Sequence, residues 1–190
     1  TEPGKSYIPF ASVSEACRNN SITCIAPTKA FNMAGMQTAA VSVPNPVLRH
    51  KVWRGLNTDE IAEPNAFAVP AAVAAFTKGG AWLDALRAYV QQSKERVVQF
   101  VAQELPQLSV VPSEATYLLW LDCGKLGGDG AEIAQVIRRE TGLYLSDGDQ
   151  YGGNGNQFLR MNLACPHSVV EDGLRRLKAG ILAYQAQKNV

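Results

Sequence analysis

Two segments of the sequence carry side chains that could do covalent or ionic chemistry. In the first, Ala26–Gly35, Lys29 follows Pro27 and Thr28 directly after the apolar run Ile22–Ile25. Most lysines in such turns are surface lysines. An amine that is partly desolvated at the end of a buried strand can instead lose its proton and add to a carbonyl, which a Schiff-base lysine requires. This position makes Lys29 a candidate nucleophile.

The second segment, Gln157–Pro166, puts Arg160 in the middle of an apolar strand. A buried guanidinium without a partner is very costly, so Arg160 must pair with an acid inside the protein or face a cavity. In the second case, the planar guanidinium would hold a carboxylate ligand through two parallel hydrogen bonds. The residues alone leave both alternatives open.

The composition argues against several other classes of function. The 190 residues include 18 Lys and Arg and 17 Asp and Glu, which gives a net charge of +1 without long blocks of like charge. We therefore expect no surface for nucleic acid or for a membrane. The sequence has no signal-peptide pattern, and its longest nearly apolar run is too short to span a bilayer. Because the cysteines lack metal-ligand spacing, we expect reduced thiols in a cytoplasmic protein and no metal site.

The elements that must position these residues can be read from the hydrophobic pattern. Apolar residues at near 3.6-residue spacing predict one long amphipathic helix over 81–105, ended by Pro106. Before this helix, the sequence predicts helices over 12–18, 47–56 and 65–78, a buried strand over 21–25, and a second run of small and β-branched residues over 37–43. After it, we expect strands over 108–111, 115–121, 143–145 and 157–163, and helices over 131–140 and from the capping box of Ser168 and Glu171 onward. The order β-β-α-β-β-α after Pro106 predicts an α+β unit with its own core.

These segments resemble a known enzyme family. Ala26–Gly35 is similar to the lysine segment of the fold-type I pyridoxal-phosphate enzymes, and more narrowly to that of the MalY/PatB-type carbon–sulfur β-lyases, which are class I/II aminotransferase-like. Phe158–Pro166 resembles the strand with which this family binds a carboxylate. Further segments match in the same order along nearly the whole chain: Ile8–Ser12, Glu63–Asn65, Ala81–Leu86 and Ala115–Asp122.

The resemblance implies a fold, a cofactor and residue roles. Residues 1–80 would be the C-terminal part of the large α/β domain of the fold-type I pyridoxal-phosphate-dependent transferase fold, and 81–190 the long bridging helix and an α+β small domain. Lys29 would hold pyridoxal 5′-phosphate covalently and then move the Cα proton of the substrate. Thr28 would contact the cofactor phosphate, and Arg160 would bind the substrate α-carboxylate.

The sequence also departs from the family pattern. Ala26 stands where many relatives have a phosphate-binding Ser, and Gln37 where many aminotransferases have an Arg. The family's phosphate loop, its ring-stacking aromatic and the Asp that pairs with the pyridinium nitrogen have no counterpart in the chain. The resemblance therefore covers only the C-terminal portion of the family fold.

For the parent enzyme, the resemblance implies a carbon–sulfur β-lyase that converts L-cystathionine or an S-substituted cysteine into a thiol, pyruvate and ammonia. It also implies a homodimer acting on a small amino-acid substrate. Two alternatives stay open: a class I/II aminotransferase, and a non-catalytic binding or regulatory module. We expect the chain by itself to have little activity, because those family contacts to the cofactor are missing from it.

Overall fold

The structure is a computed structural model that describes residues 1–188. The described chain forms two compact units. The N-terminal unit is Ser6–Leu86, and the C-terminal unit consists of Thr1–Lys5 and the described residues from Arg87 onward. Among these residues, no helix is both long enough and apolar enough to cross a membrane.

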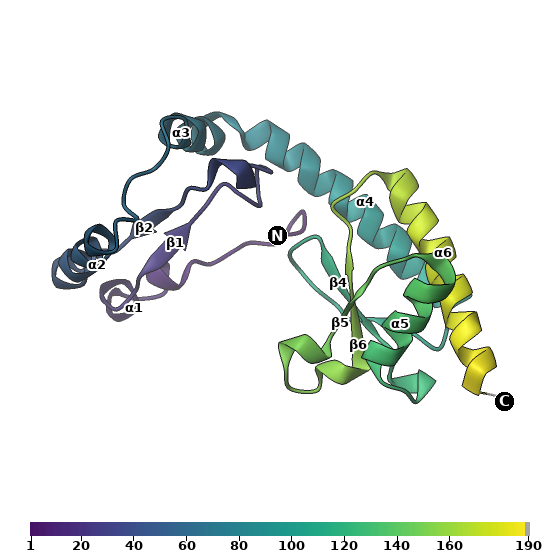
Figure 1. Cartoon of the computed structure of the whole chain (residues 1–190). Coiled ribbons are helices and arrows are strands. Elements are labelled where there is room, and N and C mark those ends of the chain that lie inside the picture. Colours follow the sequence, from purple (N-terminus) through teal and green to yellow (C-terminus); the bar gives the residue numbers. More distant parts are fainter. Residues whose placement is uncertain (189–190) are drawn as a thin grey trace. The chain divides into compact units, whose positions relative to one another are not determined.

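The C-terminal unit is built on a four-stranded antiparallel sheet (Figure 1). Its strands lie in the order β3 (Ser109–Val110), β4 (Leu118–Asp122), β6 (Phe158–Asn162) and β5 (Ser146–Asp147). Three helices pack with it: α4 (Gly80–Glu104), α5 (Gly130–Thr141) and α6 (His167–Lys188). This unit confirms the predicted α+β arrangement.

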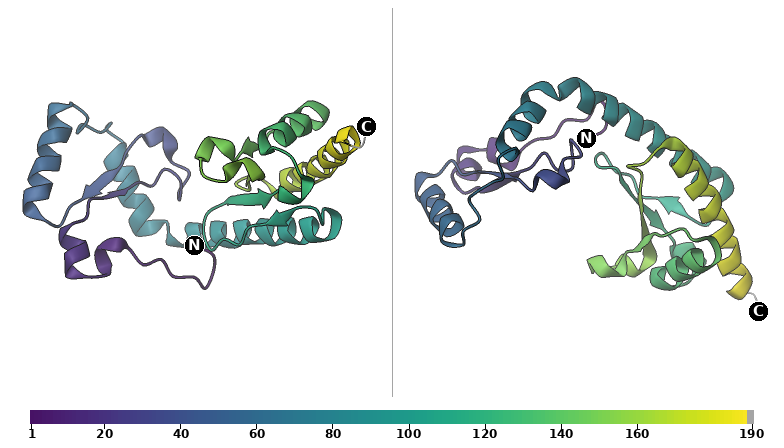
Figure 2. Two further views of the ribbon diagram at one scale, coloured as in Figure 1. Left: turned by 90° about the horizontal axis from the view of Figure 1, so that it is seen from below. Right: turned by 45° about the horizontal axis from the view of Figure 1, so that its top comes forward.

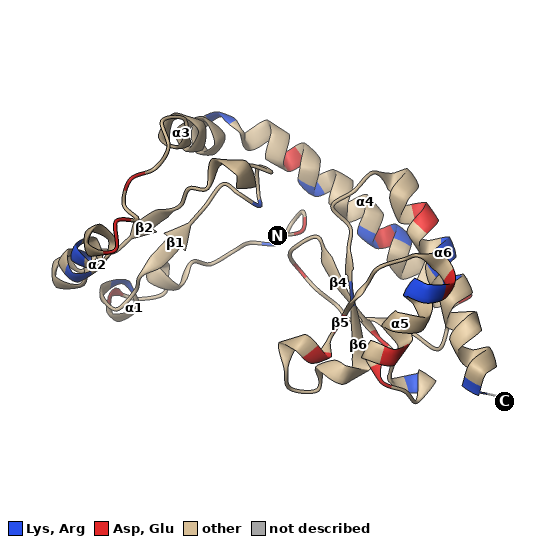
Figure 3. Cartoon of the chain, viewed as in Figure 1, with Lys and Arg blue, Asp and Glu red and all other residues tan. Residues whose placement is uncertain are grey.

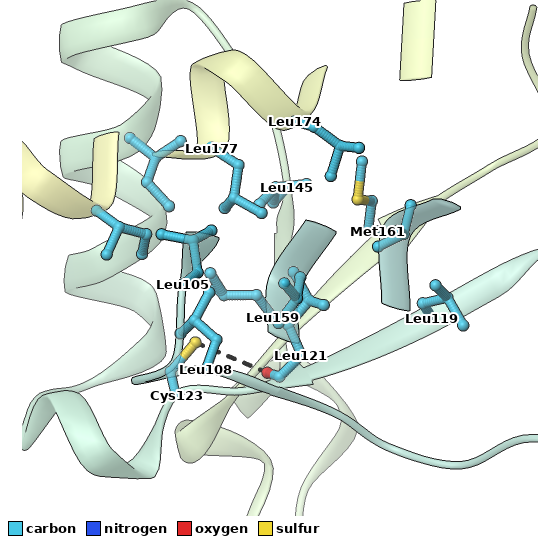
Figure 4. Packing of buried hydrophobic residues seen from close by; sticks show 14 of the residues in the cluster. Leu105, Leu108, Leu119, Leu121, Cys123, Leu145, Leu159, Met161, Leu174 and Leu177 are labelled. Carbon is cyan, nitrogen blue, oxygen red and sulfur yellow. Dashed lines mark hydrogen bonds between the residues drawn. The ribbon is translucent and has the colours of Figure 1, made fainter. Parts of the chain in front are cut away.

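The core of this unit lies between those helices and one face of the sheet. Strand residues alternate in burial, so Leu119 and Leu121 of β4 and Leu159 and Met161 of β6 are buried, while the residues between them are partly exposed. Leu105, Leu174 and Leu177 pack against these strand residues in one continuous cluster (Figure 4). The opposite face of the sheet carries the partly exposed Trp120 and Arg160.

Helices α4 and α5 follow the patterns in their sequences. Figure 2 shows α4 as one uninterrupted helix, in agreement with its long apolar stripe. The carboxylate of Asp129 caps α5 by accepting a hydrogen bond from the Ala131 backbone N–H at 2.7 Å. Gly142 ends α5 in the left-handed region at φ 72°.

The N-terminal unit is built differently. It contains α1 (Glu15–Asn19), α2 (Pro46–Thr58), α3 (Ala68–Lys78) and the two-stranded antiparallel sheet of β1 (Thr23–Ile25) and β2 (Ala40–Ser42). Val43 and Ala68 are its buried hydrophobic residues, whereas the large cluster of buried hydrophobics belongs entirely to the C-terminal unit. This unit therefore lacks a core of comparable size.

Three sequence expectations are wrong. The strand expected to be buried over 21–25 is largely exposed, because among the described residues it pairs with β2 alone and lies at the edge of a two-stranded sheet. The strand expected over 143–145 lies at Ser146–Asp147, where it pairs with β6. Ser168 does not cap α6: the helix begins at His167, and the Glu171 carboxylate accepts from Arg96 of α4 instead.

Candidate functional site

Lys29 lies in a hydrogen-bonded turn that leaves the end of β1. Within this turn, the Phe31 N–H donates to the Pro27 carbonyl and the Met33 N–H donates to the Thr28 carbonyl, each at 3.0 Å. Asn32 follows in the left-handed region with φ 52°, a conformation that Asn adopts more readily than most residues. These local bonds give the backbone at Lys29 a defined path.

Phe31 anchors this turn to the two helices that follow it. Its ring makes an edge contact with Phe76 of α3 at 5.7 Å between ring centres, and it stacks on Trp82 of α4 at 6.0 Å. Gly79 makes this packing possible, because a Cβ at that position would lie 2.5 Å from Phe31 Cε1. Lys29, two residues before Phe31, is positioned by this aromatic contact.

The Lys29 side chain itself is exposed. The expected partial desolvation of its amine is therefore wrong for the described chain, because the residues of the turn pack through Pro27 and Phe31 and leave the lysine uncovered. Within residues 1–188, the Lys29 amine and the Thr28 hydroxyl have no hydrogen-bond partner, and Lys29 forms no ion pair. Both groups are available to a ligand.

Arg160 is placed by the register of the larger sheet. It lies opposite Trp120 of β4 on one side and opposite Ser146 of β5 on the other. Directly opposed residues on neighbouring strands share a face, so the three side chains come together on the side of the sheet away from the core. An Nη2–H of Arg160 donates to Ser146 Oγ at 3.3 Å.

An aromatic pair frames the guanidinium. The Arg160 guanidinium carbon lies 4.9 Å from the centre of the Tyr151 ring, a cation–π contact. The Tyr151 ring in turn makes an edge contact with Trp120 at 5.2 Å between centres. Among the described residues, no carboxylate pairs with Arg160. The internal salt bridge left open by the sequence is therefore not formed there, and most of the guanidinium donors remain unused.

Two glycines hold Tyr151 in this position. Tyr151 lies in a short 3₁₀ turn, Asp149–Tyr151, which begins after Gly148. The backbones of Gly148 and Gly155 approach so closely that a Cβ on Gly155 would lie 2.0 Å from the Gly148 carbonyl oxygen. The glycine-rich loop thus has a structural role in the Arg160 site.

The sequence identified Arg160 but not the three side chains that lie beside it. Trp120 lies within a segment that matches the family, yet Trp120, Ser146 and Tyr151 come from separate parts of the chain and only strand pairing unites them. Lys29 and Arg160 lie in different units. The Lys29 turn and the Arg160 cluster are therefore described as separate candidates, each within its own unit.

The chain matches the model of a known family, "Aminotransferase class I and II", over residues 7–177. The chain belongs to this family. A curated member, "Cystathionine beta-lyase PatB" of Bacillus subtilis, is 38% identical over 178 residues, which make up 94% of this chain and 46% of that protein. "Protein MalY" of Escherichia coli is 28% identical over 93% of this chain and 45% of its own length. The chain thus spans about half the length of the curated family members it matches.

Solved structures of the family share the fold. A pyridoxal-phosphate-bound putative aminotransferase from Clostridium difficile superimposes with a TM-score of 0.91 at 32% identity, over 95% of this chain and 46% of the other. Cystalysin from Treponema denticola, which contains pyridoxal 5′-phosphate, gives a TM-score of 0.90 at 26% identity, over the same shares. The predicted fold is confirmed: the chain has the fold of part of a fold-type I enzyme.

Proposed function

We propose that the chain is part of a pyridoxal-phosphate-dependent carbon–sulfur β-lyase that acts on L-cystathionine or related S-substituted cysteines. The observation that carries this proposal is the Arg160 guanidinium, which is oriented by Ser146 and Tyr151 and has no acidic partner among residues 1–188. Such a group is suited to hold the α-carboxylate of an amino acid. The names of the relatives from Bacillus subtilis and Corynebacterium glutamicum, 38% and 31% identical, favour the lyase reaction.

The residues around Lys29 fit the cofactor in part. The exposed amine can bind an aldehyde, and the adjacent Thr28 hydroxyl can donate to a phosphate oxygen. Ala26 and Gln37 add no charge or hydroxyl at positions where many relatives bind phosphate. Bound at Lys29, pyridoxal phosphate would supply an electron sink for the carbanion formed at Cα.

The chain's own residues would then bind the substrate and move a proton. Arg160 would hold the α-carboxylate through two parallel hydrogen bonds, which fixes the amino acid relative to the base. Tyr151 and Trp120 would shield one side of this ion pair from water and so strengthen it. The Lys29 amine would accept the Cα proton as a general base. Loss of the thiolate from Cβ, followed by hydrolysis, gives a thiol, pyruvate and ammonia.

A second candidate is an aminotransferase. It is favoured by the description of the family model and by the name of the Clostridium difficile protein, which calls it an aminotransferase. Both reactions need the same base and the same carboxylate clamp. They differ after the Cα proton has been removed: a transaminase returns a proton to the cofactor, whereas in a lyase the electron pair left at Cα expels the thiolate from Cβ.

One assay separates the two reactions. The whole protein that contains this chain is incubated with pyridoxal phosphate and L-cystathionine, and pyruvate is measured with and without an added keto acid. Pyruvate formed without the keto acid supports the lyase, whereas conversion of the added keto acid into its amino acid, without pyruvate, supports the aminotransferase. Absence of both products contradicts the proposal. The cytoplasmic location and the homodimer remain predictions, and sedimentation of the whole protein tests the dimer.

A further inference from the structure

The segment Glu63–Asn65 matches the family pattern but has no role in the proposed reaction. In the structure it lies shortly before α3, and local hydrogen bonds fix Asn65 at the approach to that helix. The side-chain oxygen of Asn65 accepts from the Phe67 N–H at 3.0 Å, and its backbone carbonyl accepts from the Ala68 N–H at 3.0 Å. The carboxamide therefore has a defined position, and its NH2 group is left for another partner.

That NH2 group binds the turn that carries Lys29. Asn65 Nδ2 donates to the Met36 carbonyl at 2.7 Å, across 29 residues of sequence. The Met36 N–H donates to the Met33 carbonyl at 3.0 Å, and the Met33 N–H donates to the Thr28 carbonyl at 3.0 Å. A continuous chain of hydrogen bonds thus leads from Asn65 to the peptide group that joins Thr28 to Lys29.

The Met36 carbonyl lies next to a strained residue at the end of this turn. Gln37 is left-handed, with φ 47° and ψ 47°, and its N–H donates to the Ala34 carbonyl at 3.1 Å. Residues other than glycine seldom adopt this conformation, and it persists only where neighbouring groups fix it. The strands on either side of the turn, β1 and β2, carry no charged side chain (Figure 3). The Asn65 amide supplies a fixed donor at this point.

We infer that Asn65 is a positioning residue for Lys29. Its amide holds the Met36 carbonyl and so fixes the far end of the turn, while the Phe31 ring anchors the middle of the turn on α3 and α4. A backbone held at two points restricts where the lysine amine can lie, and proton transfer requires such placement. The inference rests on the proposed function for the role of Lys29, whereas the hydrogen bond to Met36 is independent of that function.

The substitution Asn65→Asp tests this hydrogen bond alone. A carboxylate keeps the acceptor for the Phe67 N–H but has no N–H to donate to the Met36 carbonyl. In the 190-residue chain, we expect hydrogen exchange over residues 28–37 to become about ten-fold faster. The control is Asn57→Asp, because Asn57 Nδ2 also donates to a backbone carbonyl at 2.7 Å, but within α2. This control should leave exchange over 28–37 unchanged.

Kinetics of the whole protein that contains the chain test the link to Lys29. Asn65→Asp should lower kcat for pyruvate formation about ten-fold and leave KM within about two-fold, because Arg160 still holds the carboxylate. Asn57→Asp should change neither constant. Equal effects of the two substitutions on exchange, or a kcat that Asn65→Asp leaves unchanged, would overturn the inference. If the unsubstituted protein forms no product, the proposed reaction is wrong, and exchange over 28–37 then decides whether Asn65 holds the turn.

Discussion

Arg160 is oriented by neighbours that carry no charge. Ser146 accepts one of its hydrogen bonds and the Tyr151 ring lies beside the guanidinium, so its orientation is set without neutralising it. A guanidinium paired with an internal carboxylate would be a poor ligand site, because the ligand would have to displace that acid. The arrangement leaves the positive charge available to an anionic ligand, as the proposed function requires.

Under the proposed function, this geometry gives a residue-level prediction for the whole protein that contains the chain. Arg160→Lys should lower kcat/KM for the amino-acid substrate about 10–100-fold, since an ammonium cannot make the two parallel bonds and a charged hydrogen bond contributes about 1.5–3 kcal/mol. The loss should appear mainly in KM. The control is Arg175→Lys, at an exposed arginine whose contact is with Asp172 on the same helix. Equal kinetics for the two variants would contradict the role of Arg160.

Two cysteines report on the two units separately. Burial, assisted by the nearby Asp122 carboxylate, raises the pKa of the Cys123 thiol to about 12. At pH 8, about one such thiol in ten thousand is therefore a thiolate, the reactive form. Cys24 is exposed. In the chain alone, a disulfide reagent at pH 8 should modify Cys24 within the mixing time and Cys123 only as fast as the C-terminal unit opens.

Mass spectrometry of the modified peptides follows both sites in one sample. Cys24→Ser provides the control, since it should remove modification of the Cys24 peptide alone and leave the Cys123 rate unchanged. The slow rate should rise with urea, because opening of the core limits it. Rapid modification of Cys123 in native buffer would show that the core of the C-terminal unit is not closed in solution.

The close packing of helices α5 and α6 depends on a glycine, Gly180, at their contact. A Cβ at Gly180 of α6 would lie 2.8 Å from Ile137 Cγ1 of α5, whereas one at Gly173 would meet Met161 at an ordinary 3.5 Å. Gly180→Ala should destabilise the C-terminal unit by about 1–3 kcal/mol through overpacking. Gly173→Ala should stabilise it by about 0.5–1 kcal/mol, since alanine favours the helix. Urea unfolding followed by the accessibility of the buried Cys123 thiol measures both, and equal effects would contradict the close packing.

The elements also show what could be predicted from sequence. The long apolar stripe of α4 and the breaker Pro106 locate that helix to within a residue. The strand near 145 could not be placed in this way, because Leu145 is buried in the core while pairing with β6 places the strand at Ser146. The prediction of a capping box at Ser168 and Glu171 was wrong for a similar reason: Glu171 binds Arg96, which is distant in the sequence. Local sequence patterns predicted the helix α4, whereas contacts with residues distant in the sequence set the position of β5 and the start of α6.

The same limit applies to the candidate site. Arg160 was recognisable because a charge in an apolar strand needs an explanation, and Lys29 because of its place after a strand. The side chains that surround Arg160 and Lys29 come from other parts of the sequence, which the two motifs do not predict. Lys29 is exposed in the described chain, so the described residues do not cover its side chain. At the scale of the whole molecule, the site needs more than the residues that its two motifs provide.

The last prediction concerns the 190-residue chain by itself: it should bind pyridoxal phosphate weakly and release little pyruvate from L-cystathionine. Lys29 can bind an aldehyde, but that bond is reversible and persists only with further contacts to the phosphate and ring. Thr28 offers one such contact, while Ala26 and Gln37 offer neither charge nor hydroxyl. The chain is titrated with pyridoxal phosphate, the yellow absorbance of bound cofactor is followed, and pyruvate is assayed, with Lys29→Ala as the control. A stoichiometric band that this substitution abolishes, accompanied by turnover equal to that of the whole protein, would show that the chain contains the complete site.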